Sequence, residues 1–448
     1  MRRFLIFALA IVAGSAISQQ TKKAITFEEA VKIALQNSVL LNQQKNNIEA
    51  VQAQNTSNWA GFAPTLGFQS QAVRVNGNTF NQQQGKVING TFDQVTGSLN
   101  ASLNLFSGLN QINKVKQSTS QVDAQAYNIK RTSQDVISLI TAAYLQVLLD
   151  VELSRIAKEN HIALSKQLEQ ITEQVKVGAK APVDEYNQDS QTKAAEIRML
   201  QSEINLTNDR ALLTQILLQD PSDEYDVVKP AWLVEVNPND FQKIFETALQ
   251  NRADYQRALK NEEAAKYGMK ATRGFMMPNL SAFGTVYSAY NHSHGDSTVR
   301  SFENQFTSDN IRKIYGLQLN IPILGGNQPL QNRANYIQQK VIYRNNSIIR
   351  SSVEYQVKTD VFRAYQNYSL FAKTFTVSEA QLKAAEYAYQ LETERYNLGV
   401  SSFVDFINAN KNYVQSQTDR AQAEYRMLFQ KVLVDYAVGT IKPEDFEK

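Results

Sequence analysis

The chain has 448 residues and a formal net charge of only +3, which excludes the strongly basic surface that nucleic-acid binding requires. It contains no cysteine, which excludes disulfide bonds, a thiol nucleophile, a zinc cluster of Cys and His, and a lipid-modified N-terminal cysteine. With only three histidines and no recognisable catalytic set, the sequence predicts neither an enzyme nor a bound metal or cofactor.

Residues 1–18 are predicted to be a cleaved secretory signal. Arg2 and Arg3 precede an apolar run from Phe4 to Val12, and small residues follow at positions 16–18. This order of a basic, an apolar and a small-residue segment is typical of export signals. Cleavage after Ser18 would remove two arginines and no acid, leaving a net charge of +1.

Long stretches without proline or glycine predict the helices. In the first half they cover 26–60, 109–177 and 184–218, and in the second half about 240–273, where Gly268 is the only breaker, 331–398 and 403–438. All nine prolines lie at the joints, and proline inside a helix costs about 3 kcal/mol. Two shorter helices placed end to end match the length of a long one, so each half is predicted to pair one long helix with two stacked shorter ones.

Between the first two helices of each half, the apolar spacing changes to every second residue, which predicts β-strands. The strands are expected at about 65–76, 95–106, 279–290 and 313–324. A soluble sheet would alternate in the same way. However, the lengths suit tilted strands that cross a bilayer, and aromatic residues lie near several ends.

The connections 76–94 and 291–311 are rich in Asn, Gln and Gly, and we expect them to be exposed extracellular loops. We find no apolar stretch of about 18 residues after the signal, so membrane insertion is expected to use the strands.

The two halves are copies of one another. Ala34-Leu35-Gln36-Asn37 recurs 214 positions later as Ala248-Leu249-Gln250-Asn251, and Gly178 recurs as Gly399 at a similar spacing of 221. A register kept over so many residues predicts two equivalent halves. We assign 19–220 to the first structural repeat, 221–239 to a connector, and 240–448 to the second repeat with a C-terminal tail.

Four strands cannot close a barrel, and an open sheet edge in lipid leaves backbone groups unpaired. The protein is therefore expected to oligomerise. Eight strands from a dimer or twelve from a trimer could both close.

The signal, the duplicated halves, the order helix, strand, strand, helix, helix, and the phrases Tyr396-Asn397-Leu398-Gly399 and Val404-Asp405 resemble the TolC family of outer-membrane efflux proteins. The resemblance covers essentially the whole mature chain. It implies a homotrimer in the outer membrane of a Gram-negative bacterium, in which four strands from each protomer form a twelve-stranded barrel above a periplasmic tunnel of long helical hairpins. It also implies a passive conduit for export, in a tripartite efflux or type I secretion system with a periplasmic adaptor (membrane fusion protein) and an inner-membrane transporter.

The two turns between the long hairpin helices are the candidate functional positions. The glycines suit a helix stop with positive φ, and Asp184 and Asp405 begin the following helices, where a carboxylate favours the positive end of the helix dipole. Helix capping explains both aspartates as well as a gate does. The resemblance implies an entrance gate and an adaptor contact at these turns. The gate would contain Asp184, Tyr396, Ser401, Asp405 and Asn408, and the adaptor contact Gly178, Ala179, Gly399, Val400 and Ser401.

Two departures from the family pattern change the expected gate. Some relatives carry an arginine where this chain has Ser401, and a second acid where it has Asn408. We therefore expect hydrogen bonds from Tyr396, Ser401 and Asn408 in place of an arginine latch.

The alternative is a periplasmic adaptor or a structural coiled-coil scaffold that forms no pore. Such adaptors have one hairpin between compact, glycine-rich β modules, whereas here the hairpin occurs twice and the strands have membrane length.

Overall fold

The computed structural model describes residues 23–81, 85–220, 225–229, 241–294, 300–323 and 327–443. The predicted signal (1–18) and most of the predicted connector (221–239) lie outside these residues. The chain divides into two compact units. The hairpin unit comprises 1–42, 133–244 and 360–448, and the sheet unit comprises 43–132 and 245–359. The predicted class is confirmed: long helices dominate, and four strands form one antiparallel sheet.

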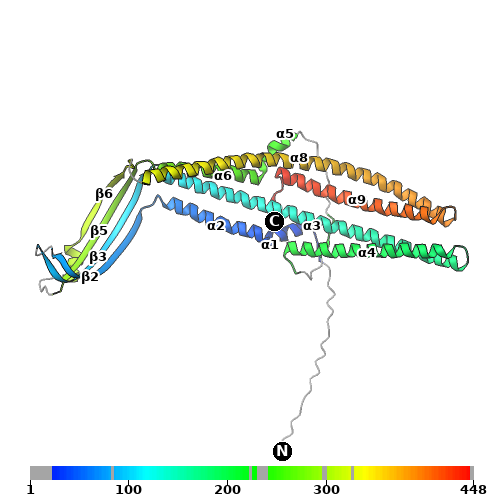
Figure 1. Ribbon diagram of the computed structural model, residues 1–448, viewed down its shortest axis with the longest axis horizontal. Helices are drawn as coiled ribbons and strands as arrows, with labels where there is room; N and C mark the ends of the chain where they lie inside the picture. The colour runs from blue at the N-terminus through cyan, green and yellow to red at the C-terminus, as the bar shows by residue number, and fades with distance from the viewer. Residues whose placement is uncertain are drawn as a thin grey trace, which may run out of the picture. The chain divides into compact units, whose positions relative to one another are not determined.

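Two helical hairpins make up most of the hairpin unit (Figure 1). The first joins α3 (Asn110–Lys176) to α4 (Pro182–Leu217), and the second joins α8 (Asn327–Asn397) to α9 (Phe403–Val438). The start of α8 lies before the expected residue 331, so its first turn contains Pro329. Proline is tolerated there because the first amides of a helix have no intrahelical partner.

The expected single helices 26–60 and 240–273 are wrong, because each is two helices. These are α1 (Phe27–Asn37) with α2 (Val39–Ala60), and α5 (Phe241–Asn251) with α6 (Ala253–Gly274). A capping box is present at the start of α1, where the Glu29 amide donates to the Thr26 hydroxyl and the Thr26 amide donates to the Glu29 carboxylate.

Both breaks occur at residues that ordinarily continue a helix. Ser38 has ψ 114° and its hydroxyl accepts a hydrogen bond from the Leu41 amide at 3.3 Å, which caps α2. Arg252 has ψ 116° and is only 1% exposed, with its guanidinium on Asp254. The partner, Asp254, is only two residues further along the chain, so the ion pair is local to the break. Neither glycine nor proline marks this position in the sequence.

The hairpin unit also contains a small two-stranded sheet. β1 (Lys23–Ile25) pairs in parallel with β4 (Tyr225–Val227). The buried Tyr144 of α3 joins both strand ends, since its hydroxyl lies 2.9 Å from the Ile25 carbonyl oxygen and 2.7 Å from that of Val228.

The apolar residues around Tyr144 form much of the core of this unit. They are Ile137, Ile140, Leu145, Val147 and Leu148. By length and composition, α3 contains a stretch that could cross a membrane, so the expectation that no such stretch exists is wrong. Half of that stretch is buried within the protein, which accounts for its apolar character without a membrane.

The sheet unit holds β2 (Thr65–Asn81), β3 (Lys86–Ser107), β5 (Asn279–Ser293) and β6 (Arg312–Asn320), in the order β2-β3-β5-β6 (Figure 1). One face is mainly apolar, as the alternation predicts, and the other is mainly polar but also carries Val75, Phe283 and Ile314. On the apolar face, Leu66 and Phe68 of β2 are 72% and 74% exposed, and Leu317 of β6 is 68% exposed. These side chains have no protein cover within a single copy.

The expected loop 76–94 is wrong over most of its length. The β2–β3 pairing continues from Asn76↔Thr91 to Asn81↔Lys86, because polar residues without proline can still form the ladder. The expected loop 291–311 also contains regular secondary structure. β5 extends to Ser293, and a short helix α7 (Phe302–Asn304) with a π-turn η1 (Gln305–Asp309) precedes β6. β6 ends at Asn320, before the Ile321-Pro322 step, where proline has no amide to donate.

Candidate functional site

The two hairpin turns have the same backbone design. Gly178 and Gly399 have φ of 75° and 73°, as the sequence predicts. After each glycine the chain closes the helix in the same way: the Ala179 amide donates to the Gln174 carbonyl at 2.8 Å, and the Val400 amide donates to the Arg395 carbonyl at 3.0 Å. This is the pattern of a Schellman stop, which requires the left-handed residue that glycine supplies.

Asp405 acts as part of a helix cap. Its amide donates to the Ser402 hydroxyl at 3.2 Å, and that hydroxyl donates to the Asp405 carboxylate at 2.7 Å. Asp184 also lies in the first turn of its helix, after Pro182 at the first position, but the preceding Ala181 forms no side-chain cap. Capping therefore accounts for the position of Asp405 more completely than for that of Asp184.

Tyr396 lies in a small core that joins the two hairpins. Its ring stacks on Phe406 of α9 at 5.0 Å between centroids, and both pack with Ile171 of α3. Tyr396 is 3% exposed, and within the described residues its hydroxyl has no hydrogen-bond partner. The expected hydrogen bond from this hydroxyl is therefore absent, because the ring is held by packing. Burial, with a smaller contribution from Asp184, raises the pKa of Tyr396 to about 12.

Lys180 connects the first turn to this tyrosine. Its Nζ lies 3.4 Å from the centroid of the Tyr396 ring, which is a cation–π contact between the hairpins. Burial lowers the pKa of Lys180, and the charge of Asp184 opposes that change. We did not predict this residue. The signal was present in the duplication, since Lys180 stands two residues after Gly178, as Ser401 stands two after Gly399.

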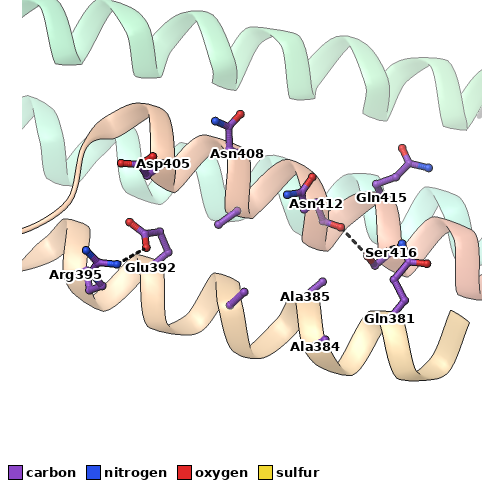
Figure 2. Close-up of a pocket in the computed structure, with 12 residues that line it drawn as sticks. Gln381, Ala384, Ala385, Glu392, Arg395, Asp405, Asn408, Asn412, Gln415 and Ser416 are labelled. Atoms are coloured by element: carbon purple, nitrogen blue, oxygen red, sulfur yellow. Dashed lines mark hydrogen bonds and ion pairs between the residues drawn. The ribbon is translucent and has the colours of Figure 1, made fainter. Parts of the chain in front are cut away.

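A groove of about 790 Å³ runs between α8 and α9 next to the second turn (Figure 2). Alanine side chains and polar or charged side chains line the groove. Its residues are Gln381, Ala384, Ala385, Ala388, Glu392, Arg395, Asp405, Asn408, Ala409, Asn412, Gln415 and Ser416. Alanines leave room between the helices, so the groove is a property of the sequence and not of a bent backbone.

At the turn end of the groove, Glu392 joins two groups. It pairs with Arg395 at 3.3 Å and accepts a hydrogen bond from the Ser401 hydroxyl (Figure 2 shows the pair with Arg395). Of the predicted gate residues, the structure thus brings Ser401, Asp405 and Asn408 to this groove. Tyr396 and Asp184 instead lie at the contact between the hairpins, and Glu392 and Arg395 were missed.

The described residues contain no group of three or more His, Cys, Asp and Glu side chains placed to hold a metal ion. The arrangement at the turns instead combines buried aromatic packing, one cation–π contact and a polar groove. Such a set can hold two helical hairpins together or release them.

Comparison with known proteins gives a consistent result over almost the whole chain. The family model described as outer membrane efflux protein matches residues 30–217 and 244–440. The outer membrane efflux protein BepC of Brucella suis is 21% identical over 436 residues, covering 97% of this chain and 89% of the relative. TolC of Escherichia coli is 20% identical over 358 residues, covering 78% and 71%.

Solved structures share the fold. The outer membrane protein VceC of Vibrio cholerae superimposes with a TM-score of 0.80 at 15% identity, covering 92% of this chain and 96% of that one. The outer membrane channel MtrE of Neisseria gonorrhoeae, solved in its open state, gives a TM-score of 0.75 at 17% identity, covering 92% and 88%.

Proposed function

The chain belongs to the outer membrane efflux protein family and is an outer-membrane efflux channel of the TolC type, and we propose that it works as a homotrimeric, passive conduit. The open sheet is the observation that supports oligomerisation, and the family supports a count of three. Within the four-stranded sheet, β2 and β6 pair on one side only, and lipid does not tolerate such edges. Three copies would supply twelve strands, joined through β2 and β6 of adjacent copies.

The two faces of the sheet support a water-filled passage. Exposed Leu66, Phe68 and Leu317 suit contact with lipid, while Ser98, Asn100 and Ser102 alternate on the other face and suit a polar lumen. A duct of this kind needs no chemistry of its own. We therefore assign the energy for transport to an inner-membrane transporter, in a tripartite efflux or type I secretion system.

The hairpin turns are the proposed contact with the periplasmic adaptor. Val177, Leu398 and Val400 are 79%, 78% and 64% exposed, which is unusual for apolar side chains unless another protein covers them. With the neighbouring Gly178, Ala179, Gly399 and Ser401, they would form the docking surface.

The proposed organisation remains a signal at 1–18, repeats at 19–220 and 240–448, and a connector at 221–239. The family model supports the duplication, because it matches one segment within each half. This match across two hairpins also leaves the adaptor and scaffold alternatives without support.

We place the gate at the hairpin turns, with Asp184 and Tyr396 at the contact between the hairpins and Ser401, Asp405 and Asn408 at the groove beside the second turn. Opening would move the second hairpin away from the first and break the Lys180–Tyr396 contact. Since a cation–π contact contributes about 0.5–2 kcal/mol, the Lys180→Gln variant is expected to raise the ratio of open to closed entrances about two- to thirtyfold. Single-channel recording in planar bilayers measures this as a higher mean conductance.

A matched control separates the ring from the hydroxyl. Tyr396→Phe keeps the aromatic face beneath Lys180 and removes only a hydroxyl without a partner, so its conductance should equal that of the wild type. If Lys180→Gln conducts like the wild type, the contact does not hold the entrance closed. If the wild-type protein forms no ion-conducting pore at all, the proposed conduit itself is wrong.

A further inference from the structure

The segment between β5 and β6 is fixed to the sheet by side-chain amides. The Asn291 amide donates to the Gln305 side-chain oxygen at 3.2 Å, and the Gln305 side-chain nitrogen donates to the Asn291 carbonyl at 3.1 Å. The Asn310 side chain donates to the Ala289 carbonyl at 2.6 Å. β6 begins at Arg312, which pairs with Tyr287, so it does not reach Ala289 and Asn291 of β5. At these two residues the edge of β5 is bonded to side-chain amides and not to a neighbouring strand.

The strand register identifies the face on which this segment lies. Gly97 pairs with Ser288 and Val95 pairs with Tyr290, at positions that share a face with Leu99 and the other apolar residues of β3. The Ser288 hydroxyl donates to the Phe306 carbonyl at 2.6 Å. A Cβ atom at Gly97 would lie 2.8 Å from the Phe306 ring. The segment therefore lies against the apolar face, and Gly97 provides the space for its phenylalanine.

Aromatic rings gather at this position. Phe302 stacks on Phe306 at 5.1 Å and meets Tyr290 edge-on, also at 5.1 Å. Phe302 is 48% exposed although it belongs to this cluster. An exposed aromatic ring that continues an apolar sheet face is suited to contact with lipid.

Charged side chains follow directly beyond the aromatic cluster on the same face. Asp93 pairs in register with His292, one position beyond the Tyr290 row on this face, and accepts hydrogen bonds from Arg74 at 2.6 Å and His294 at 2.8 Å. A change from apolar rows, through aromatic rings, to charged rows is the order found where acyl chains meet headgroups. The position of the segment in this order sets its depth.

We propose that residues 301–310 are an interfacial anchor, in which Phe302 contacts lipid where the acyl chains meet the headgroups of the outer leaflet. The exposed polar residues of the turn, such as Glu303 and Thr307, would face the headgroups. The inference rests on the proposed function, because the apolar face meets lipid only in a closed barrel.

Site-directed spin labelling tests the depth directly, and the absence of native cysteine makes every label unique. Phe302→Cys, Thr307→Cys and Phe68→Cys are each labelled in the full-length protein and reconstituted into phospholipid vesicles. Collisions with oxygen, which concentrates in the bilayer, are compared with collisions with a water-soluble nickel chelate. The oxygen-to-nickel ratio at position 302 is expected to be several-fold higher than at position 307 and to approach that at position 68.

The other outcomes overturn the inference. A ratio at position 302 as low as at position 307 would place Phe302 in water, and low collision rates with both reagents would mean that a neighbouring copy covers it. The label at position 68 reports on the proposed function separately. If that label also collides mainly with the nickel chelate, the sheet itself does not lie in lipid, and the proposed channel is wrong.

Discussion

The Gly274→Ala variant is expected to unfold at a clearly lower temperature than the wild-type protein, with a loss of about 2 kcal/mol or more. An added Cβ would lie 2.7 Å from the Gly108 carbonyl oxygen and 2.9 Å from both the amide nitrogen and the Cβ of Asn110. Two of these atoms belong to the backbone, so no side chain can rotate away. The junction between β3 and α3 would have to move.

Thermal unfolding in detergent, followed by circular dichroism, measures this loss. Gly284→Ala in β5 is the matched control, since no atom lies within 4 Å of a Cβ added there. Its midpoint should stay close to that of the wild type, because open surface positions usually change stability by less than about 0.5 kcal/mol. Equal midpoints for Gly274→Ala and Gly284→Ala would show that the backbone crossing at Gly108 is not tight.

The second large effect is a dependence of stability on pH through Asp150. This residue of α3 is 5% exposed, and its only hydrogen bond from a neutral donor comes from Gln146 at 3.3 Å among the described residues. Burial, followed by the influence of the neighbouring Asp209 carboxyl, raises its pKa from 3.8 to about 7. Burial and a neighbouring carboxylate both disfavour the ionised form of a carboxyl group.

The direction of the effect follows from the raised pKa. Between about pH 4 and pH 7 the folded protein binds a proton that the unfolded chain has released, so the stabilisation present below pH 4 is lost as pH rises through 7. Asp150→Asn removes this titration. The difference in the free energy of unfolding, variant minus wild type, is expected to be roughly 1–3 kcal/mol larger at pH 8 than at pH 5.

Denaturant unfolding at the two pH values measures the difference. Glu169→Gln, at an exposed position on the same helix, is the control and should follow the wild type at both. A wild-type stability that does not fall between pH 5 and pH 8 would mean that Asp150 is already ionised in the folded protein at pH 5.

Patterns that depend on local backbone chemistry could be predicted from the sequence. α9 has the expected bounds, and Gly178 and Gly399 have the expected positive φ, because a helix stop requires a residue that tolerates this conformation. The alternation of Val95 to Leu105 identified a strand for the same reason, since successive side chains must point to opposite faces.

Features that depend on distant contacts could not be predicted. The burial of the Tyr396 hydroxyl follows from packing against Phe406 of α9 and Ile171 of α3. Likewise, nothing adjacent to Lys180 in sequence indicates that it reaches a ring more than two hundred residues away. In each case the residue type allows several roles, and only the packing of other helices selects one.

The divergence of the two turns shows how a duplicated design acquires different contacts. In the first turn, Lys180 crosses to the other hairpin, whereas at the equivalent place in the second turn Ser401 donates to Glu392 of its own hairpin. The first turn therefore supplies a contact between the hairpins, whereas the second turn forms a hydrogen bond within its own hairpin.

The measurement that tests the central claim most directly is disulfide cross-linking between β2 of one copy and β6 of the next. The chain has no cysteine, so double variants that combine Leu66→Cys or Phe68→Cys with Leu317→Cys or Leu319→Cys report only the introduced pairs. Disulfides require Cα atoms within about 7 Å, so only directly adjacent strands will bond. A closed three-copy barrel predicts that at least one pair gives a non-reducing ladder that stops at the trimer. A ladder that stops at the dimer, or an uncross-linked monomer with every pair, would contradict the trimeric conduit.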